Sequence, residues 1–499
     1  MSNHTIAGPA PWKLGFRSSK HFITWVVAIA VFTDVFIYGM IIPILPDMLR
    51  TRASIPKTEQ QKWISILLAA FGGAIFIASR ESSLSVSAGV TIIGYFADRS
   101  PSRQTPFLVG LFALGGSTVM FWFARVISVL VIARTLQGLS AAVVWTIGLA
   151  LIVDTLGKAQ AGAAMGIVSM AMTAGTLFGP FIGGIVLSKA GYHAVFSIAI
   201  ALIILDIILR LAMIDRKTAQ RWISAEAGAD EETERLLGSQ AMPGSSWHSE
   251  VARNSNDHPG HDGAHPAGEP AANIAQPKGP ISQSQKKVVP GIVRLVCSGT
   301  LLVDLQATVV EAIVYSAFDT VLPLYAMNTF NMSSMGVGLC FIPLFAPSLL
   351  STVIGAAVDR YGARQVAILG FVIDIPTFLI LRLVTENTTR DKIILVVLLF
   401  FTGLAGSLKV VSLMVEVSRV VHQKENKCPG IFGEQGGTAQ AYGLFNVAWS
   451  GGQVIGPLMA GFLVDQYGWA TMASVLSAIS GGTALILGIS APAMLRQAS

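Results

Sequence analysis

The strongest constraint on this chain is the scarcity of charge along most of its length. Its 499 residues include 34 Lys and Arg and 28 Asp and Glu, or 12% charged residues, whereas apolar residues make up 53%. Soluble globular proteins carry about 25% charged residues. The segment 215–294 holds 19 of the 62 charges, so the other 419 residues hold only 43. Most of the chain therefore cannot form a water-exposed globule, and its composition also excludes a disordered or collagenous protein.

Long apolar runs recur with the length of membrane-spanning helices. A bilayer core of about 30 Å needs roughly 20 apolar residues per helix, and six such runs precede a polar stretch while six follow it. A polar tail precedes the first run, which is too long and proline-rich for a cleaved signal. The sequence therefore predicts an all-α integral membrane protein with twelve transmembrane helices. The predicted spans are 22–46, 63–97, 107–124, 126–153, 162–188, 194–214, 298–327, 336–358, 366–385, 393–420, 437–463 and 470–493.

The distribution of Lys and Arg predicts the orientation, because positively charged loops stay in the cytoplasm. With both termini cytoplasmic, the cytoplasmic segments carry 22 Lys and Arg and the outside segments carry 9. The net charge of +6 then reflects topology, and no nucleic-acid partner is needed to explain it. The predicted organisation is a cytoplasmic tail at 1–21, a six-helix bundle at 22–214, a cytoplasmic low-complexity linker at 215–297, a second six-helix bundle at 298–493 and a tail at 494–499.

No metal site is expected in the linker or at the cysteines, although histidines can in principle bind a metal. The linker is rich in Gly, Ala, Ser and Pro and cannot bury a core, so its His258, His261 and His265 lack a fixed geometry. The three cysteines are widely spaced and form no CxxC pair. Two sequons, starting at Asn331 and Asn387, fall in loops assigned to the outside and are candidate glycosylation sites.

The predicted second span contains an anomaly. The run 63–97 has 35 residues, or about 52 Å as a helix, which is too long for one crossing. Ser79–Ser83 interrupts it with polar and charged residues. The sequence indicates either a helix broken around 79–90 or an insertion left by the gene model.

The two predicted bundles also resemble each other. The motif Gly94–Arg99 with Arg103 recurs as Gly355–Arg360 with Arg364, at an offset of 261 residues. Duplicated six-helix halves joined by a linker are typical of carriers whose halves rock around a site at the bilayer midplane. A second set of matches has an offset of 277 residues: Gly166, Gly179, Pro180, Gly184 and Gly191 with Gly443, Gly456, Pro457, Gly461 and Gly468.

Several of these motifs resemble signatures of the major facilitator superfamily. GYFADRSPSR, from Gly94, resembles its loop 2–3 signature; ARTLQG, from Ala133, resembles its helix-4 signature; AGTLFGPFIGG, from Ala174, resembles its helix-5 antiporter signature. The segments from Thr33 to Pro46, Ser316 to Tyr325 and Pro429 to Asn446 are most similar to twelve-helix drug:proton antiporters, in the fungal branch related to vesicular amine transporters. The resemblance covers the chain except the linker.

The resemblance implies a latch at the cytoplasmic helix ends. A carboxylate at a helix–loop junction can pair with Arg or with the positive end of a facing helix, and Asp154 stands where the family has the partner acid of loop 2–3. Pro101 and Ser102 replace the usual Gly of this loop, and the alternative is that these charges only set the topology. The candidate latch residues are Gly94, Asp98, Arg99, Arg103, Asp154, Gly355, Asp359, Arg360 and Arg364.

The antiporter motif contributes small residues at near-helical spacing beside a proline. Small faces allow close helix packing, and proline bends a helix. The resemblance implies a bend that blocks ion leak and favours exchange, and tight packing alone is the alternative. The motif residues are Gly175, Gly179, Pro180, Gly183, Gly184, Gly456, Pro457 and Gly461.

Ionisable residues within spans are expensive to bury, so a functional role is expected for them. Burial disfavours the charged form of a carboxylate. Such a group can take up a proton and release it when a cationic substrate or Arg134 approaches, and this competition would couple the two fluxes. Glu311 and Asp319 lie about 12 Å apart along one helix and about 80° apart around it, so both could line one cavity. The candidate coupling residues are Asp34, Arg134, Glu311, Asp319 and Glu416.

The resemblance sharpens some of these assignments and weakens others. Asp34 and Asp319 match acids in helices 1 and 7 of vesicular amine carriers, but Asn446 stands where those carriers have an acid in helix 11. Asp206, Asp304 and Asp374 are expected at span ends or contacts between helices. Trp145 and Trp449 could stack on an aromatic substrate or simply pack.

The expected function is secondary active transport. The chain is expected to export a small amphipathic compound, such as a drug, toxin or secondary metabolite, in exchange for protons, with the proton gradient and no cofactor. The alternatives are a vacuolar or vesicular amine loader, a proton-coupled uptake symporter and a non-transporting sensor. An enzyme is not expected, because no nucleophile–base pair, nucleotide loop or metal cluster is apparent. The expected partners are the substrate, protons and the lipid bilayer, for a monomer in the plasma membrane rather than a vacuolar or vesicular one.

Overall fold

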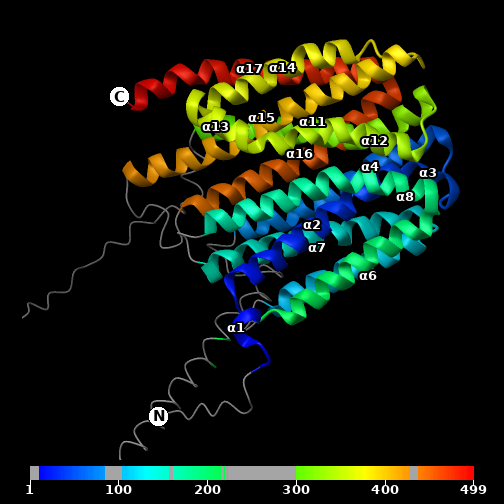
Figure 1. The fold of residues 1–499 in the computed structure, drawn as a ribbon. Coiled ribbons are helices and arrows are strands. Elements are labelled where there is room, and N and C mark those ends of the chain that lie inside the picture. Colours follow the sequence, from blue (N-terminus) through cyan, green and yellow to red (C-terminus); the bar gives the residue numbers. More distant parts are fainter. Residues whose placement is uncertain are drawn as a thin grey trace, which may run out of the picture. The chain divides into compact units, whose positions relative to one another are not determined.

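The computed structural model describes residues 11–84, 104–156, 161–214, 219, 222, 299–427 and 437–498. The chain separates into two compact units, residues 1–7 with 221–289 and residues 8–220 with 290–499, and every helix below belongs to the second. Regular structure in the described ranges is helical throughout (Figure 1). The helices are α1 (Leu14–Arg17), α2 (Lys20–Ile41), η1 (Ile42–Ile44), α3 (Leu45–Thr51), α4 (Lys57–Leu84), α6 (Gln104–Phe123), α7 (Ile127–Leu156), α8 (Ala161–Ala212), α11 (Gly299–Phe330), α12 (Ser334–Phe345), η2 (Ala346–Leu350), α13 (Ser351–Tyr361), α14 (Ala363–Leu381), α15 (Thr389–Lys427), α16 (Gly437–Tyr467) and α17 (Trp469–Ala498).

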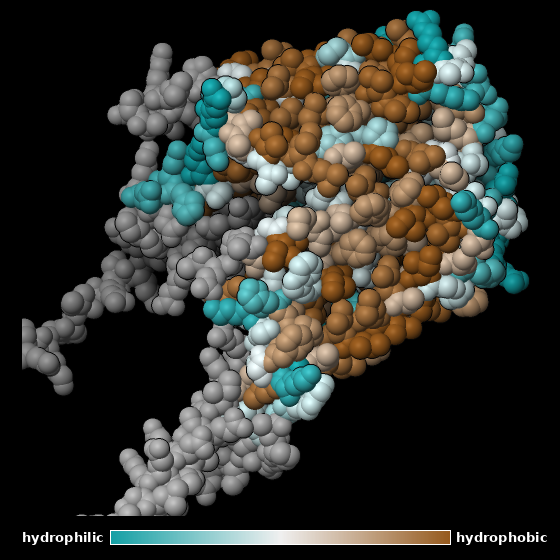
Figure 2. Space-filling model, in the orientation of Figure 1, coloured by the Kyte–Doolittle hydropathy of each residue, from teal (hydrophilic) through white to brown (hydrophobic). Residues whose placement is uncertain are grey.

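The longer helices are long enough to cross a membrane, and their composition is apolar. Ten helices among the described residues are long and apolar enough to cross a bilayer. One of the ten, Ala164–Ala212, contains two helices that meet at Gly191, where φ is 80°, and Phe107–Phe123 is apolar but shorter. Hydrophobic side chains cover the middle of the face shown in Figure 2, and hydrophilic side chains gather towards its ends. The prediction of an all-helical membrane protein is confirmed, while the number of twelve spans and the cytoplasmic termini stay predictions.

Local sequence signals explain where several helices begin. The hydroxyl of Ser19 accepts a hydrogen bond from the Phe22 amide at 3.3 Å and caps α2, and Ser333 caps α12 in the same way through the Gly336 amide at 3.4 Å. These caps satisfy amides that have no partner within the helix. Pro43 lies in η1, a 3-10 turn that connects the end of α2 to α3.

The anomalous polar residues of the second predicted span are helical. α4 runs without interruption from Lys57 to Leu84 and therefore includes Ser79–Ser83. A break at 79–84 does not occur, and residues 85–90 lie outside the described part of the chain. α4 also begins six residues before the predicted span, because the polar segment Lys57–Lys62 is helical.

Helices from the two predicted bundles pack directly against each other. α4 lies along α16, and α8 lies along α12. Hydrogen bonds also cross between the bundles: the Gln61 side chain donates to the Thr320 carbonyl oxygen at 3.3 Å, and η1 packs against α11 and α12. The end of the bundle that carries α3 and the start of α12 is called the far end, and the end that carries α1 is called the near end (Figure 1).

Candidate functional site

An arginine, a tyrosine and an aspartate from three helices form a buried chain. Arg134 of α7 is fully buried, and its guanidinium carbon lies 5.6 Å from the ring centre of Tyr38 in α2. The Tyr38 hydroxyl donates a hydrogen bond to Asp319 Oδ2 of α11 at 3.0 Å. Tyr38 therefore connects a cation of the first predicted bundle to an acid of the second.

Aromatic rings surround the rest of the Arg134 side chain. The guanidinium carbon lies 5.5 Å from the ring centres of both Phe71 and Phe121, which is within cation–π range. Arg134 Nη1 donates to Gln137 Oε1 at 3.3 Å. In the described part of the chain, Arg134 Nε and Nη2 have no acceptor, and Asp319 Oδ1 has no donor. Unpaired buried polar atoms are costly. The group Arg134–Tyr38–Asp319 therefore retains the capacity to bind a further polar group or a proton.

Asp34 forms a second buried contact, one turn earlier on α2 than Tyr38. Its Oδ2 accepts a hydrogen bond from Trp145 Nε1 of α7 at 3.1 Å, and only 5% of the residue is exposed. Like Asp319, it is held by a neutral aromatic donor. Within the described ranges neither aspartate forms an ion pair at salt-bridge distance, and Asp34 and Asp319 are called the lone acids below.

A group of three charges lies among α11, α14 and α15. The Lys409 ammonium contacts Glu311 Oε2 and lies 2.5 Å from Asp374 Oδ2, and all three side chains are buried. Ser480 of α17 adds a longer hydrogen bond to Asp374 Oδ2 at 3.4 Å. These three residues, called the triad, carry one positive and two negative formal charges. Buried ion pairs require such close geometry to offset their desolvation.

Two glycines make room for the triad. A Cβ atom on Gly406 would lie 2.9 Å from Glu311 Oε1, and one on Gly370 would lie 2.7 Å from the Lys409 side chain and 2.9 Å from the Ala405 carbonyl oxygen. All three distances are shorter than ordinary van der Waals contact. The missing side chain of Gly370 therefore lets α14 approach α15, and that of Gly406 leaves room on α15 for Glu311 of α11.

The sequence-predicted coupling residues thus belong to separate networks. Glu311 and Asp319 share α11, but Glu311 joins the triad and Asp319 joins Tyr38. Glu416 lies further along α15 and pairs with Arg419 at 3.4 Å, within its own helix. Asp206 and Asp304 are fully buried, and their carboxylate oxygens have no hydrogen-bond donor among the described residues.

The two tryptophans noted in the sequence occupy different surroundings. Trp145 donates to Asp34, as described above. Trp449 of α16 lies 5.7 Å from the ring of Tyr315 in α11, and Tyr315 lies 5.5 Å from Phe345 in α12. Trp449 is therefore part of an aromatic cluster, and both tryptophans are partly rather than fully buried.

The antiporter-motif glycines sit at backbone-to-backbone helix contacts. Cβ atoms on Gly175, Gly179 and Gly183 would each meet the backbone of α2 within 3 Å, and one on Gly184 would meet Ser334 and Gly338 of α12. The second repeat has the same arrangement. Cβ atoms on Gly452 and Gly456 would meet α11, and one on Gly461 would meet Ser65 of α4. In both repeats, earlier glycines pack within a bundle and a later one packs between bundles. Pro180 and Pro457 lie inside α8 and α16.

Much of the predicted latch lies outside the described residues. Gly94, Asp98, Arg99 and Arg103 fall in the range 85–103, and the side chain of Asp154 is likewise not described. In the second repeat, Gly355 lies in α13, Asp359 and Arg360 are exposed, and Arg360 lies 5.3 Å from the ring of Tyr361. Arg364 is buried, donates to the Leu487 carbonyl oxygen at 3.0 Å and contacts Ser490, so it fastens α14 to α17.

Both sequons lie in loops at the far end. Asn331, between α11 and α12, and Asn387, between α14 and α15, are exposed (Figure 1). Asn331 has a left-handed backbone with φ of 52°. Their accessibility is compatible with glycosylation, which stays a prediction.

Sequence reasoning missed three residues of these networks. Tyr38 carried no sufficient signal, and Asp374 was expected at a span end or a contact between helices but without its partner, because these partners come from distant parts of the chain. Lys409 did carry one: a lysine within an apolar span requires a counter-ion. The search for that counter-ion would have led to Asp374 and Glu311, the acids in neighbouring predicted spans.

The sequence was compared with protein families after these contacts had been established. The model of the Major Facilitator Superfamily matches residues 27–298 and 305–497. The MFS-type transporter ppzB of Metarhizium rileyi is 32% identical, over 95% of this chain and 96% of its own. An uncharacterized MFS-type transporter, C18.02, of Schizosaccharomyces pombe is 31% identical over 94% and 95%. The human vesicular acetylcholine transporter is 28% identical over 40% of this chain and 44% of its own.

Solved structures with the same fold are more distant in sequence. The nucleoside transporter NupG superposes with a TM-score of 0.60 and 12% identity, covering 94% of this chain and 98% of its own. The human organic anion transporter MFSD10 gives 0.57 and 14%, covering 94% and 99%. These similarities establish the fold and carry no information on the substrate.

Proposed function

Because the chain belongs to the Major Facilitator Superfamily and is a multi-pass membrane transporter, we propose that it exports a small amphipathic organic compound in exchange for protons. Its two six-helix bundles would expose the site alternately to the two sides of the membrane, driven by the proton gradient without a cofactor. Vesicular amine loading is the second candidate, and proton-coupled uptake and a sensor role rank below both.

The observation that carries this proposal is the buried series of contacts from Arg134 through Tyr38 to Asp319. It spans both bundles, is buried, and retains an unpaired carboxylate oxygen and unpaired guanidinium donors among the described residues. A proton on Asp319 neutralises the acid, and a cationic substrate group does the same. Only one of the two can bind at a time, which couples their opposite movements.

The aromatic residues support an amphipathic substrate. Tyr38 and Trp145 contact the lone acids, and Tyr315 and Trp449 belong to α11 and α16, helices of the second bundle. Rings beside a carboxylate suit a molecule with a cationic group and an apolar body, since cations bind to aromatic faces. We infer such a molecule as the substrate.

The partial similarity to the human vesicular acetylcholine transporter favours the second candidate. That protein's name specifies a quaternary amine as its cargo. Asn446, exposed in α16, replaces the acid that the resemblance leads one to expect there. The full-length fungal relatives are named only as MFS-type transporters, so export across the plasma membrane remains the preferred proposal.

Transport by the purified protein tests the coupling. Proteoliposomes would be loaded with a panel of cationic and neutral amphipathic compounds, and flux measured with and without a proton gradient. We expect gradient-dependent flux in the wild type, lowered at least about tenfold in Asp34→Asn or Asp319→Asn. Glu386→Gln, an exposed acid in the loop before α15, is the matched control. Gradient-dependent flux that persists in both variants would refute the roles of the lone acids while leaving transport itself intact.

Topology and location belong to the same proposal. We propose twelve spans with both termini in the cytoplasm, a monomeric carrier and residence in the plasma membrane. Asn331→Gln and Asn387→Gln would each remove a glycan if the far end faces outwards, which a mobility shift in gels detects. A fluorescent C-terminal tag would locate the protein, and vacuolar fluorescence would favour the amine-loading alternative.

A further inference from the structure

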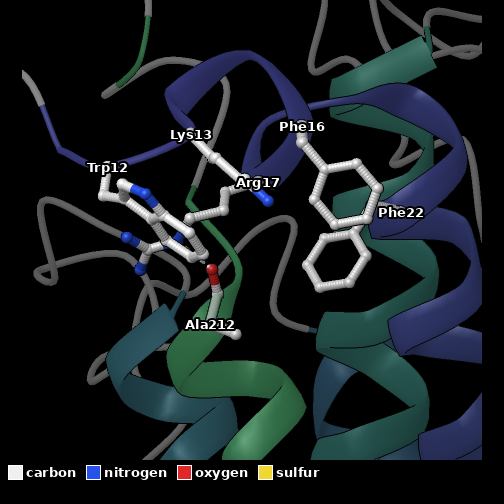
Figure 3. A pocket seen from close by; sticks show the side chains of 6 residues that line it. All are labelled: Trp12, Lys13, Phe16, Arg17, Phe22 and Ala212. Atoms are coloured by element: carbon white, nitrogen blue, oxygen red, sulfur yellow. Dashed lines mark hydrogen bonds between the residues drawn. The ribbon is translucent and has the colours of Figure 1, made fainter.

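The first described residues form a short hook at the near end. Trp12, Lys13, Phe16 and Arg17 fold back beside α2, and together with Phe22 and Ala212 they line an open pocket of about 630 Å³ (Figure 3). The hook contains the single turn α1 and a left-handed residue, Lys13, with φ of 51°. The pocket lies where α2 begins and α8 ends.

The hook is fastened to the second half of α8. Arg17 Nε donates to the Ala212 carbonyl oxygen at 2.5 Å, and the Ile214 amide donates to the Arg17 carbonyl oxygen at 3.0 Å. These bonds use carbonyl groups that a helix leaves unpaired at its C-terminus. The pocket is therefore a built feature whose walls come from the N-terminal segment and from the end of the first predicted bundle.

Its apolar walls are unusually exposed. Trp12 is 75% exposed and Phe16 is 61% exposed, and the Phe16 ring lies 5.0 Å from that of Phe22. The two rings face the indole of Trp12 across the pocket in Figure 3. Tryptophan is enriched where membrane-spanning helices meet the lipid headgroups.

Among the described residues that line the pocket, the charged ones are Lys13 and Arg17, and both are basic. Lys13, Arg17 and Lys20 lie within eight residues of one another, and the first 33 residues contain no Asp or Glu. Arg17 forms no ion pair with another described residue, and the carbonyl oxygens that it contacts do not neutralise its charge. A ligand suited to this pocket has an anionic head and an apolar chain.

We propose that the pocket binds one anionic phospholipid, with its phosphate beside Lys13 and Arg17 and an acyl chain along Phe16 and Phe22. Basic residues next to a spanning helix attract anionic lipids. The bound lipid bridges α2 and the end of α8, so it stabilises the first bundle at its near end. This site is distinct from the buried acids and does not depend on which compound is transported.

The far end supplies a matched control. There, Lys62 lies 6.0 Å from the ring of the partly buried Trp63, so a lysine again accompanies a tryptophan. The Trp63 indole, however, donates to Glu59 Oε2 at 3.3 Å. The acid beside this pair makes it a poor site for an anionic headgroup.

The test compares lipid binding by the full-length protein and its variants. Native mass spectrometry would count bound phosphatidylglycerol and phosphatidylcholine on the wild type, Lys13→Gln, Trp12→Ala and Lys62→Gln. We expect one phosphatidylglycerol to bind preferentially, about fivefold more weakly in Lys13→Gln and also more weakly in Trp12→Ala, with Lys62→Gln unchanged. Thermal unfolding in neutral detergent identifies any variant that is misfolded, and Lys13→Arg should restore binding.

Three results would overturn the proposal. Equal binding of phosphatidylcholine would remove the role of charge, and equal losses in Lys13→Gln and Lys62→Gln would remove the assignment to this pocket. Glycerol phosphate that competes with the lipid at equal concentration would indicate a site for free phosphate compounds, with no part for the aromatic walls.

Discussion

The lone acids and the triad place the same chemical group, a buried carboxylate, in opposite circumstances. Asp34 and Asp319 each accept a hydrogen bond from a neutral aromatic donor. Glu311 and Asp374 share the ammonium of Lys409. A carboxylate whose cation is fixed beside it contributes its charge to the packing of helices, whereas one held by a neutral donor keeps its charge for a proton or a substrate. The triad should therefore govern stability, and the lone acids transport.

The largest effect should follow from removing the cation of the triad. Lys409→Met leaves two buried carboxylates without a counter-ion, which should lower the free energy of unfolding by about 3–5 kcal/mol. Thermal unfolding of the purified protein measures this loss. Asp34→Asn is the matched change at a lone acid and should leave the unfolding temperature nearly unaltered, because Trp145 can still donate to the amide oxygen. An equal loss of stability in Lys409→Met and Asp34→Asn would contradict the distinction between the triad and the lone acids.

Added volume beside the triad should lower the free energy of unfolding by less than the loss of the Lys409 charge does. In Gly370→Ala the new methyl group presses on Lys409 and on the Ala405 carbonyl oxygen, which should lower the free energy of unfolding by about 2 kcal/mol. Gly482→Ala in α17 is the control, because nothing lies within 4 Å of its added carbon, and it should be neutral or slightly stabilising. A neutral Gly370→Ala would mean that α14 and α15 can separate without loss.

The hydroxyl of Tyr38 should matter for transport more than for stability. Tyr38→Phe removes the donor to Asp319 but keeps the ring under Arg134, at a cost of about 1 kcal/mol. We expect proton-driven flux to fall several-fold and its pH dependence to move, since the charge of Asp319 loses its donor. Tyr467→Phe, at the exposed end of α16, is the control. A pH profile identical to the wild type would contradict a role for Asp319 in proton exchange.

The smallest effect should come from the periphery of the triad. Ser480 donates to Asp374 over 3.4 Å, a length at which hydrogen bonds are weak. Ser480→Ala should lower the free energy of unfolding by less than about 0.5 kcal/mol, because Lys409 remains. A loss as large as that of Lys409→Met would show that Asp374 depends on the serine rather than on the lysine.

The sequence was informative about elements whose cause is local. Apolar runs such as 366–385 and 470–493 predicted α14 and α17 closely, because the bilayer sets the length of a span. Polar termini were less predictable: Lys57–Lys62 belongs to α4 although it is hydrophilic, since helix formation extends beyond the membrane core. The family resemblance rested on motifs and is confirmed by the match along the chain.

The site was predictable only in part, because helical spacing shows which residues share a helix but not what each one faces. The 80° between Glu311 and Asp319 is enough to direct one towards Lys409 and the other towards Tyr38. Arg134 was recognised as a buried cation, but its aromatic surroundings come from α2, α4 and α6. Such partners depend on how distant helices pack, which one sequence does not specify.

The glycines of α8 and α16 have a mechanical consequence. At Gly184 and Gly461 the two bundles touch through backbone and short side chains, so little there has to change rotamer when the surfaces slide. Long interlocking side chains would have to withdraw and re-engage at each cycle. A contact of this kind would keep the two bundles packed together while offering little steric resistance to their relative movement.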